Sequence, residues 1–293
     1  MKSASPEVSI IFPAKNEGDN VKKTLDSLFV THSNYHYEVI VVDDGSNDGC
    51  CNFIKTYSKR NHIKLIRTEG IGAANARNLG AKNAKGKYFA FCDAHLFFKD
   101  YWIDKLLKPL RDGKTDAICP AIADVNNPSS IGYGQSLKSN LGVYWKGKCQ
   151  NISDTAILPG GCFIISQSIF NNVGGFDTGF KRWGFEDIEL SIKLWLFGYR
   201  CSVLPSVTIL HLFRQSHPYQ LSSHHINYNL LRMAYSHFNQ SRIKKCKNLI
   251  KKEDPKKVEK YVLKDGVLHQ RNAYIKRRKH DDTWYFNRFS ISF

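Results

Sequence analysis

Apolar and polar stretches alternate along the first 122 residues in a pattern that predicts a sheet with helices on both faces. Short runs of β-branched and aromatic residues are each followed by a stretch with apolar residues at helical spacing. The run that ends at Val42 is apolar almost throughout, which is typical of a strand buried on both faces. Strands and helices in this order predict an α/β fold with a mostly parallel sheet. The predicted strands are 8–12, 38–42, 63–66, 88–91 and 117–119.

Two further segments follow this alternation. Residues 123–220 are less regular, with turn-forming clusters at 126–128 and 159–161 and a strongly helical stretch that starts near Glu186. From residue 241 onward there are 16 Lys+Arg and 6 Asp+Glu, so the end of the chain is basic. We therefore predict a division into 1–122, 123–220 and a basic, partly helical C-terminal extension at 221–293.

Composition excludes several classes of protein. The chain of 293 residues is 42% hydrophobic and 24% charged with a net charge of +17, which excludes a disordered or collagen-like chain. No apolar run approaches the roughly 18–20 residues of a membrane span, and the N-terminal residues lead into a strand rather than a signal-peptide core. Eight scattered cysteines match neither a disulfide framework nor a CxxC metal site. We expect a soluble, cytoplasmic protein.

Polar segments follow four of the predicted strands. Since ligands of parallel sheets bind at the carboxyl ends of the strands, these segments are where chemistry is expected. Each has an ordinary alternative; the acidic segment after the second strand, for example, is good turn and helix-cap chemistry. Together at one edge of a sheet they indicate a binding site. The segments are 13–17, 43–48, 72–80 and 93–95.

These segments resemble, in order and spacing, the family 2-type glycosyltransferases, which bind a nucleotide sugar on a fold called GT-A. The resemblance implies that 1–122 is the nucleotide-sugar-binding half and 123–220 the acceptor-binding and catalytic half of one domain. It assigns Pro13, Ala14, Glu17 and Asp44 to the nucleoside, usually uridine. A carboxylate accepts the ring N–H of uracil, and a guanidinium pairs with phosphate. Arg77 is therefore expected near the base or the diphosphate.

The segment Asp93-Ala94-His95 contains two possible metal ligands. Side chains at i and i+2 of an extended segment point the same way, so Asp93 and His95 can meet one divalent ion, with diphosphate oxygens completing its shell. Mixed oxygen and nitrogen ligands suit Mn²⁺ better than Mg²⁺, which prefers oxygen.

The second half resembles the catalytic half of the polypeptide N-acetylgalactosaminyltransferases. In those enzymes an Asp-x-His motif and the histidine of a later His-x-Phe-Arg motif bind Mn²⁺. The resemblance implies that Asp93, His95 and His211 are metal ligands and that Arg214 and Tyr219 hold the UDP diphosphate. The segments that carry this likeness are 159–165, 174–177, 183–191, 211–214 and 218–219.

The same resemblance marks the donor sugar and the catalytic carboxylates. Gly161 and Trp183 are assigned to nucleotide-sugar binding, although a tryptophan there also fits a core position. If the reaction inverts the anomeric centre, Asp187 deprotonates the acceptor; if it retains configuration, Glu186 and Asp187 orient sugar hydroxyls. The sequence departs from those enzymes at Phe185, which replaces a glycine, and at Asp187, where asparagine is usual.

The expected function is metal-dependent transfer of a sugar from a UDP-sugar to a hydroxyl or other nucleophile, with Mn²⁺ or Mg²⁺ as cofactor. A glycan, a glycolipid and a peptide all remain open as the acceptor. The alternatives are a nucleotidyltransferase, which would need a glycine-rich phosphate loop after the first strand, and a nucleic-acid-binding protein, which would explain the charge. The segment after the first strand is not a glycine-rich loop, which argues against a nucleotidyltransferase. No zinc-finger spacing is present, so we expect no nucleic-acid partner. The basic segment is a solvated face, a grip for an acidic peptide, or a peripheral contact with the anionic inner face of a membrane.

Overall fold

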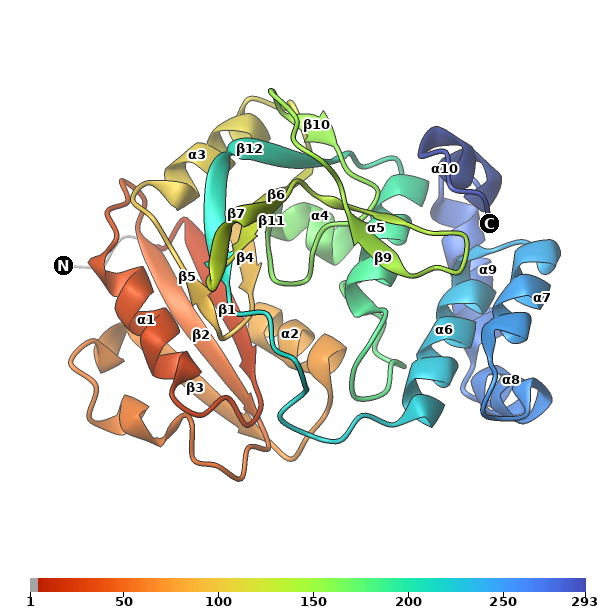
Figure 1. The fold of residues 1–293 in the computed structure, drawn as a ribbon, viewed down its shortest axis with the longest axis horizontal. Helices are drawn as coiled ribbons and strands as arrows, with labels where there is room; N and C mark the ends of the chain where they lie inside the picture. Colours follow the sequence, from red (N-terminus) through yellow and green to blue (C-terminus); the bar gives the residue numbers. More distant parts are fainter. Residues whose placement is uncertain (1–4) are drawn as a thin grey trace.

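The computed structural model describes residues 5–293, which form a central sheet, helices on both faces and a group of C-terminal helices at one end (Figure 1). The strands are β1 (Val8–Ala14), β2 (Tyr37–Asp44), β3 (Ile63–Thr68), β4 (Tyr88–Cys92), β5 (Leu96–Phe97), β6 (Ala117–Asp124), β7 (Asn127–Gly132), β8 (Gln135–Leu137), β9 (Val143–Trp145), β10 (Ser153–Asp154), β11 (Cys162–Ser166) and β12 (Cys201–His211). The helices are α1 (Asn20–Val30), α2 (Ala73–Lys82), α3 (Trp102–Arg111), α4 (Gln167–Asn172), α5 (Glu186–Leu196), α6 (Ser223–His237), α7 (Gln240–Leu249), α8 (Pro255–Lys264), α9 (Val267–Arg277) and α10 (Asp282–Arg288), with short 3₁₀ turns η1 (Asn52–Lys55) and η2 (Arg60–His62).

The sheet is parallel in its first half and mixed in its second. Its strand order is β10-β12-β6-β11-β4-β1-β2-β3, and β5 and β7 pair with β12 and β6. Strand β1 runs parallel to both β2 and β4, and β2 runs parallel to β3, as expected. Strand β11 lies antiparallel between β4 and β6, because the chain returns to the sheet without a crossover helix. The α/β class is confirmed, and the parallel arrangement holds for β1–β4.

Burial on both faces explains the near-continuous apolar strands. Successive side chains of β1 enter opposite hydrophobic clusters: Ile10 packs with α1 and α3 on one face, and Ile11 packs with α2 on the other. Residues 39–42 of β2 are at most 1% exposed. The helices therefore fix both faces, and only the ends of the strands remain open to bind a ligand.

The C-terminal residues form five helices, α6–α10, that share one hydrophobic cluster with the sheet and α5 (Figure 1). Polar contacts inside this packing include an ion pair of 2.9 Å between Arg232 Nε and Asp177 Oδ1, and a hydrogen bond of 3.1 Å from Tyr285 Oη to the Ala156 carbonyl. Basic composition therefore does not mean a loosely attached tail. The functional division at residues 122 and 220 stays a prediction.

Three sequence-based expectations concern compartment and membrane. The N-terminal stretch that was expected to carry no leader includes residues 1–4, which lie outside the described residues. All eight cysteines have free thiols, in agreement with the absence of a disulfide framework. Among residues 5–293, no helix is both long enough and apolar enough to cross a bilayer.

Candidate active site

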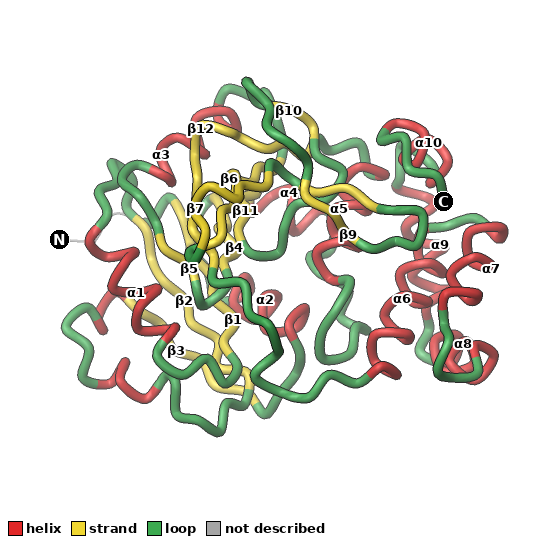
Figure 2. The backbone as a smooth tube through the Cα atoms, viewed as in Figure 1, coloured by secondary structure: helices red, strands yellow, loops and turns green. Residues whose placement is uncertain are grey.

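A cavity of about 920 Å³ opens at the carboxyl ends of β1, β2 and β4. Its outer wall includes the long loop that joins β12 to α6 (Figure 2). All fourteen site residues expected from the sequence line this one cavity. They are Pro13, Ala14, Glu17, Asp44, Arg77, Asp93, His95, Gly161, Trp183, Glu186, Asp187, His211, Arg214 and Tyr219.

Asp93, His95 and His211 converge on one point of the cavity. Asp93 follows β4, His95 precedes β5, and His211 ends β12, which pairs with β5 and so brings the two histidines together. Nε2 of His211 and Nε2 of His95 lie 3.5 Å and 3.9 Å from Oδ2 of Asp93. One ligand atom from each residue lies within 4.8 Å of the others, so the three fit a single divalent ion.

The groups around this cluster leave the expected ligand atoms free. Nδ1 of His95 lies 3.1 Å from Oε2 of Glu17, which leaves Nε2 to face an ion. Nη2 of Arg77 donates to Oδ1 of Asp93 at 2.9 Å, which leaves Oδ2 of Asp93 to face the ion. The carboxylate and the guanidinium therefore orient two of the three ligands.

Electrostatics keep Asp93 ionised. Burial alone would raise the pKa of Asp93, but the hydrogen bond with His211 and the charges of Arg77, His95 and His211 lower the pKa well below its usual range. An ionised carboxylate is the form that binds a metal ion.

Glycine is needed beside the cluster. A Cβ atom on Gly161 would lie 3.2 Å from Cδ2 of His211 and 3.6 Å from Oδ2 of Asp93, within the space that the ligands face. The neighbouring Gly160 approaches Asp187 in the same way, with 3.1 Å from its Cβ position to Oδ2. Larger side chains at either position would fill the cavity at its most polar point.

Basic and aromatic groups stand next to the cluster. Arg214 forms an ion pair with Glu17, and its Nη2 lies 3.1 Å from Nδ1 of His95. Lys15 donates from Nζ to the Asp44 carbonyl at 2.7 Å and lies 5.9 Å from the ring centre of Tyr219. Sequence reasoning missed Lys15, although it stands inside the polar segment after the first strand. Glu17 contacts His95 and Arg214, and its assignment to the nucleoside stays a prediction.

Asp44 organises the loop that follows β3. Its Oδ1 accepts hydrogen bonds from Thr68 Oγ1 and Ile71 N, both at 2.6 Å, and its Oδ2 accepts one from Gly72 N at 2.9 Å. One acceptor position on Oδ2 therefore remains for a ligand. Gly72 has φ +91°, and a Cβ there would lie 2.8 Å from the Arg182 backbone, so only glycine fits.

Arg77 lines the cavity but is almost fully buried. Its side chain is 4% exposed and donates to Asp93 as described, to Oε1 of Glu186 at 3.1 Å and to the Gly160 carbonyl at 3.2 Å. Burial alone would lower the pKa of Arg77, but the neighbouring carboxylates Asp93, Glu186 and Asp187 raise it. The guanidinium thus links Asp93 to Glu186 of α5. Contact of Arg77 with the base or the diphosphate of a nucleotide stays a prediction.

Glu186 and Asp187 begin α5 and differ in environment. Glu186 accepts from Arg77 and, at 3.0 Å, from Gly184 N, so both of its oxygens are occupied. Asp187 accepts backbone N–H groups of Gly160 and Ile188 at 3.1 Å and 2.8 Å. Burial, followed by repulsion from Glu186, raises the pKa of Asp187 to about 6.

The residue before this pair explains a departure noted in the sequence. Phe185 has φ +67°, a left-handed conformation that glycine adopts without strain. Glycine is therefore the expected residue at this turn, and the phenylalanine occupies it at a conformational cost.

Aromatic side chains also line the cavity. Trp183 is half-buried in the wall and meets His217 edge to face at 4.6 Å. Trp145 of β9 meets Phe213 at 6.1 Å in the same wall. Sequence reasoning missed His217 and Trp145, because no spacing along the irregular segment links them to the strand ends.

Comparisons with known proteins agree with this arrangement. The model of "Glycosyl transferase family 2" matches residues 9–174, and that of "N-terminal domain of galactosyltransferase" matches residues 148–218. Polypeptide N-acetylgalactosaminyltransferase 3 of Drosophila melanogaster is 27% identical over 74% of the chain, and polypeptide N-acetylgalactosaminyltransferase 14 of Homo sapiens is 29% identical over 73%. The chain spans only 36% and 42% of the length of these relatives.

Solved structures share the fold. A crystal structure of GalNAc-T7 with UDP, GalNAc and Mn²⁺ has a TM-score of 0.76, 20% identity, and covers 99% of this chain and 57% of its own. A mannosyltransferase from Pyrobaculum calidifontis in complex with GDP-Man and Mn²⁺ has a TM-score of 0.57 and 19% identity, over 94% of this chain and 75% of its own. The GT-A fold and the family resemblance are confirmed. Since the first family model covers more than half of the sequence, the chain belongs to glycosyl transferase family 2.

Proposed function

We propose that the chain transfers a sugar from a UDP-sugar to an acceptor nucleophile and that the reaction depends on Mn²⁺ or Mg²⁺. The observation that carries the proposal is the cluster of Asp93, His95 and His211, whose ligand atoms lie within 4.8 Å of one another in a cavity large enough for a nucleotide sugar. Relatives and structural neighbours include N-acetylgalactosaminyltransferases and a complex with UDP and Mn²⁺, which supports the same donor class.

The residues divide the work of donor binding. Asp93, His95 and His211 would hold the ion, which when bound supplies positive charge to the diphosphate. Arg214 stands beside the cluster and would pair with the phosphate oxygens, exchanging its contact with Glu17 for them. Asp44, with one acceptor position left, would accept the ring N–H of uracil and so select the base.

Asp187 would act as the general base toward the acceptor. It lines the cavity, and a pKa raised to about 6 suits a group that must be ionised near neutral pH and still accept a proton. Glu186, held by Arg77 and the Gly184 amide, would position this end of α5. A base of this kind implies inversion, so an α-linked donor should give a β-linked product; an α-linked product in an NMR assignment would remove Asp187 from this role.

The acceptor belongs to one of three classes: a glycan, a glycolipid or a peptide. The aromatic residues Trp145, Trp183 and Phe213 in the cavity wall suit the apolar faces of sugar rings, which supports the first two. The N-acetylgalactosaminyltransferase relatives support the third.

The direct test is release of UDP from a panel of UDP-sugars, with GDP-mannose as a base control. We expect turnover of one UDP-sugar that requires Mn²⁺ or Mg²⁺ and is lost in His211→Ala. The matched control is His269→Ala, which removes an exposed histidine of α9 and should leave turnover unchanged. Equal turnover in chelator, or in His211→Ala, would refute the metal site, and absence of both turnover and calorimetric UDP binding would refute the donor.

A further inference from the structure

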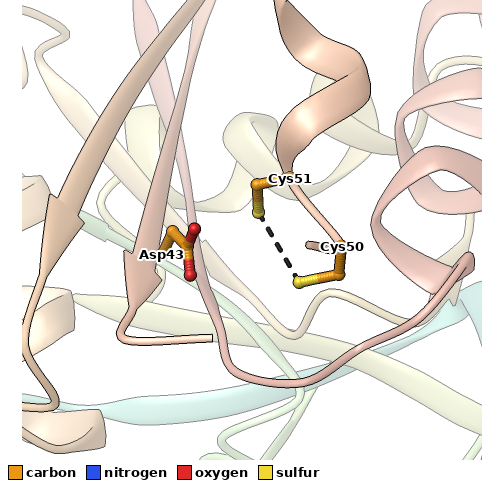
Figure 3. A group of neighbouring side chains, drawn as sticks. All are labelled: Asp43, Cys50 and Cys51. Atoms are coloured by element: carbon orange, nitrogen blue, oxygen red, sulfur yellow. Dashed lines mark hydrogen bonds between the residues drawn. The ribbon is translucent and has the colours of Figure 1, made fainter. Parts of the chain in front are cut away.

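A second group of potential metal ligands lies on the opposite side of β2 from the active site. Asp43 precedes Asp44 in the strand, so their side chains point to opposite faces of the sheet. Cys50 and Cys51 come from the turn before η1, and their sulfur atoms face each other on the side of Asp43 (Figure 3). One ligand atom from each residue lies within 4.8 Å of the others, and each of the three residues is at most 6% exposed. The active site uses none of the three.

The sulfur positions match a metal-bound pair. Sγ of Cys50 lies 3.8 Å from Sγ of Cys51. Two Zn–S bonds of about 2.3 Å at the tetrahedral angle separate the sulfur atoms by about 3.8 Å. The buried pair Cys92 and Cys162 has the same separation, but among the described residues no third ligand atom joins it. The carboxylate of Asp43 therefore distinguishes this cluster from two neighbouring thiols in a core.

We propose that Asp43, Cys50 and Cys51 bind one Zn²⁺ ion at a site separate from the active site. Both thiols lose their protons to solvent, two Zn–S bonds and one Zn–O bond form, and solvent completes the tetrahedron. Two thiolates and one carboxylate bring three negative charges to an ion of charge +2. Nε of Arg67, 3.9 Å from Oδ2 of Asp43, balances the remaining charge.

The site lies on a loop that supports the nucleotide pocket. Between Asp43 and Cys50 the chain accepts two hydrogen bonds from backbone N–H groups of the segment after β1: Asn16 N donates to Ser46 Oγ at 3.1 Å, and Gly18 N donates to Asp48 Oδ2 at 2.8 Å. Glu17, which contacts His95, stands between these two donors. A zinc ion bound by Asp43, Cys50 and Cys51 would join the two ends of this loop. Through the hydrogen bonds from Asn16 and Gly18, the loop would then hold Glu17 in place.

Cobalt(II) is the probe for this site, because a thiolate-to-cobalt charge-transfer band arises only where cysteine binds the metal. The full chain carrying His211→Ala is used, so that the three-ligand cluster of the active site is broken. We expect one equivalent of Co²⁺ to produce the band and Zn²⁺ to abolish it. The band should disappear in Cys50→Ala/Cys51→Ala and persist in Cys162→Ala, the matched change in the other buried pair.

Asp43→Asn keeps both thiols and keeps an oxygen that can accept the Ser46 N–H, which Asp43 accepts at 3.1 Å. We expect it to weaken Co²⁺ binding at least about tenfold, because loss of a group that only orients a metal ligand already weakens metal binding by about 10–100-fold. A folded His211→Ala chain that gives no thiolate band would overturn the proposal, and so would a band that survives the double cysteine variant. Neither result depends on UDP-sugar turnover, so this site and the proposed function fail separately.

Discussion

Lys193→Met should cost far more stability than loss of a surface lysine, because Lys193 is a fully buried cation of α5. Its Nζ donates to the Gly175 carbonyl at 2.6 Å and to Oε2 of Glu189 at 3.2 Å, and both side chains of the ion pair are 0% exposed. The other oxygen of Glu189 meets Nε2 of His237 at 2.7 Å. Methionine fills similar volume but leaves the Gly175 carbonyl without its donor and Glu189 without its strongest positive neighbour.

The expected loss is about 3–5 kcal/mol in the free energy of unfolding, the range for breaking one side of a buried ion pair. Of this, about 1–3 kcal/mol belongs to the unsatisfied carbonyl. Burial raises the pKa of Glu189, but Lys193 and His237 lower it below the ordinary 4.5, so the pair stabilises the fold above that pH. The difference between variant and wild type should therefore be largest at neutral pH and shrink as pH falls below 4.5.

Urea denaturation of Lys193→Met and of a matched control measures this. The control is Lys22→Met, which breaks another i,i+4 pair, with Asp26, whose side chains are 53% and 44% exposed. It should lose at most about 1 kcal/mol. Glu189→Gln combined with Lys193→Met should lose less than the sum of the single changes, because the buried charge is then gone. Equal losses for the two lysine variants would refute the reasoning.

Three further predictions concern single positions. Asp187→Asn should lower kcat by about 10²–10⁴-fold. It should also remove the acidic limb of the pH–rate profile, because the wild-type rate is expected to rise with pH through about 6 as the Asp187 carboxyl ionises. An unchanged kcat would exclude a general base at this position. Gly161→Ala should weaken Mn²⁺ binding about tenfold in calorimetry, since the added methyl group meets His211 and Asp93. The far-UV circular dichroism should not change. Wild-type affinity would show that the added methyl group does not disturb the two ligands. Ser290→Gly should raise the free energy of unfolding by about 0.5–1 kcal/mol, because this exposed residue directly after the C-cap of α10 has φ +52°. The gain should appear as a higher melting temperature, and a lower melting temperature would count against it.

The sequence was enough to predict that the polar segments after β1, β2, β3 and β4 share the cavity, because parallel strands bring their carboxyl ends to one edge whatever the details of packing. The cavity residues of the second half, from Gly161 to Tyr219, were assigned only by the resemblance to the family. The sequence could not predict which of these residues touch. Arg77 reaches Glu186 across 109 positions, and the contact between Glu17 and Arg214 spans 197, so no local spacing carries either contact. The direction of β11 was equally hidden, since a buried apolar strand has the same pattern in a parallel and an antiparallel sheet.

The C-terminal segment was harder still to interpret. The basic residues from position 241 onward predict a solvated face, but Arg232, which precedes them in the same segment, is 4% exposed and paired with Asp177 inside the packing. From the sequence alone, a lysine or arginine in solvent cannot be distinguished from one that pairs with a buried carboxylate, because the carboxylate lies elsewhere in the chain.

Helix α5 ties the chemistry to the far end of the molecule. Its first turn presents Glu186 and Asp187 to the cavity, and its next turns meet the C-terminal helices through Glu189 and Lys193. A chimera or a truncation that ends near residue 220 would therefore expose a charged helix face that now has partners, and the turn that carries Glu186 and Asp187 would move with it. Recombination with other members of the family should tolerate junctions in exposed loops of the first half better than any junction that separates α5 from α6 and α9.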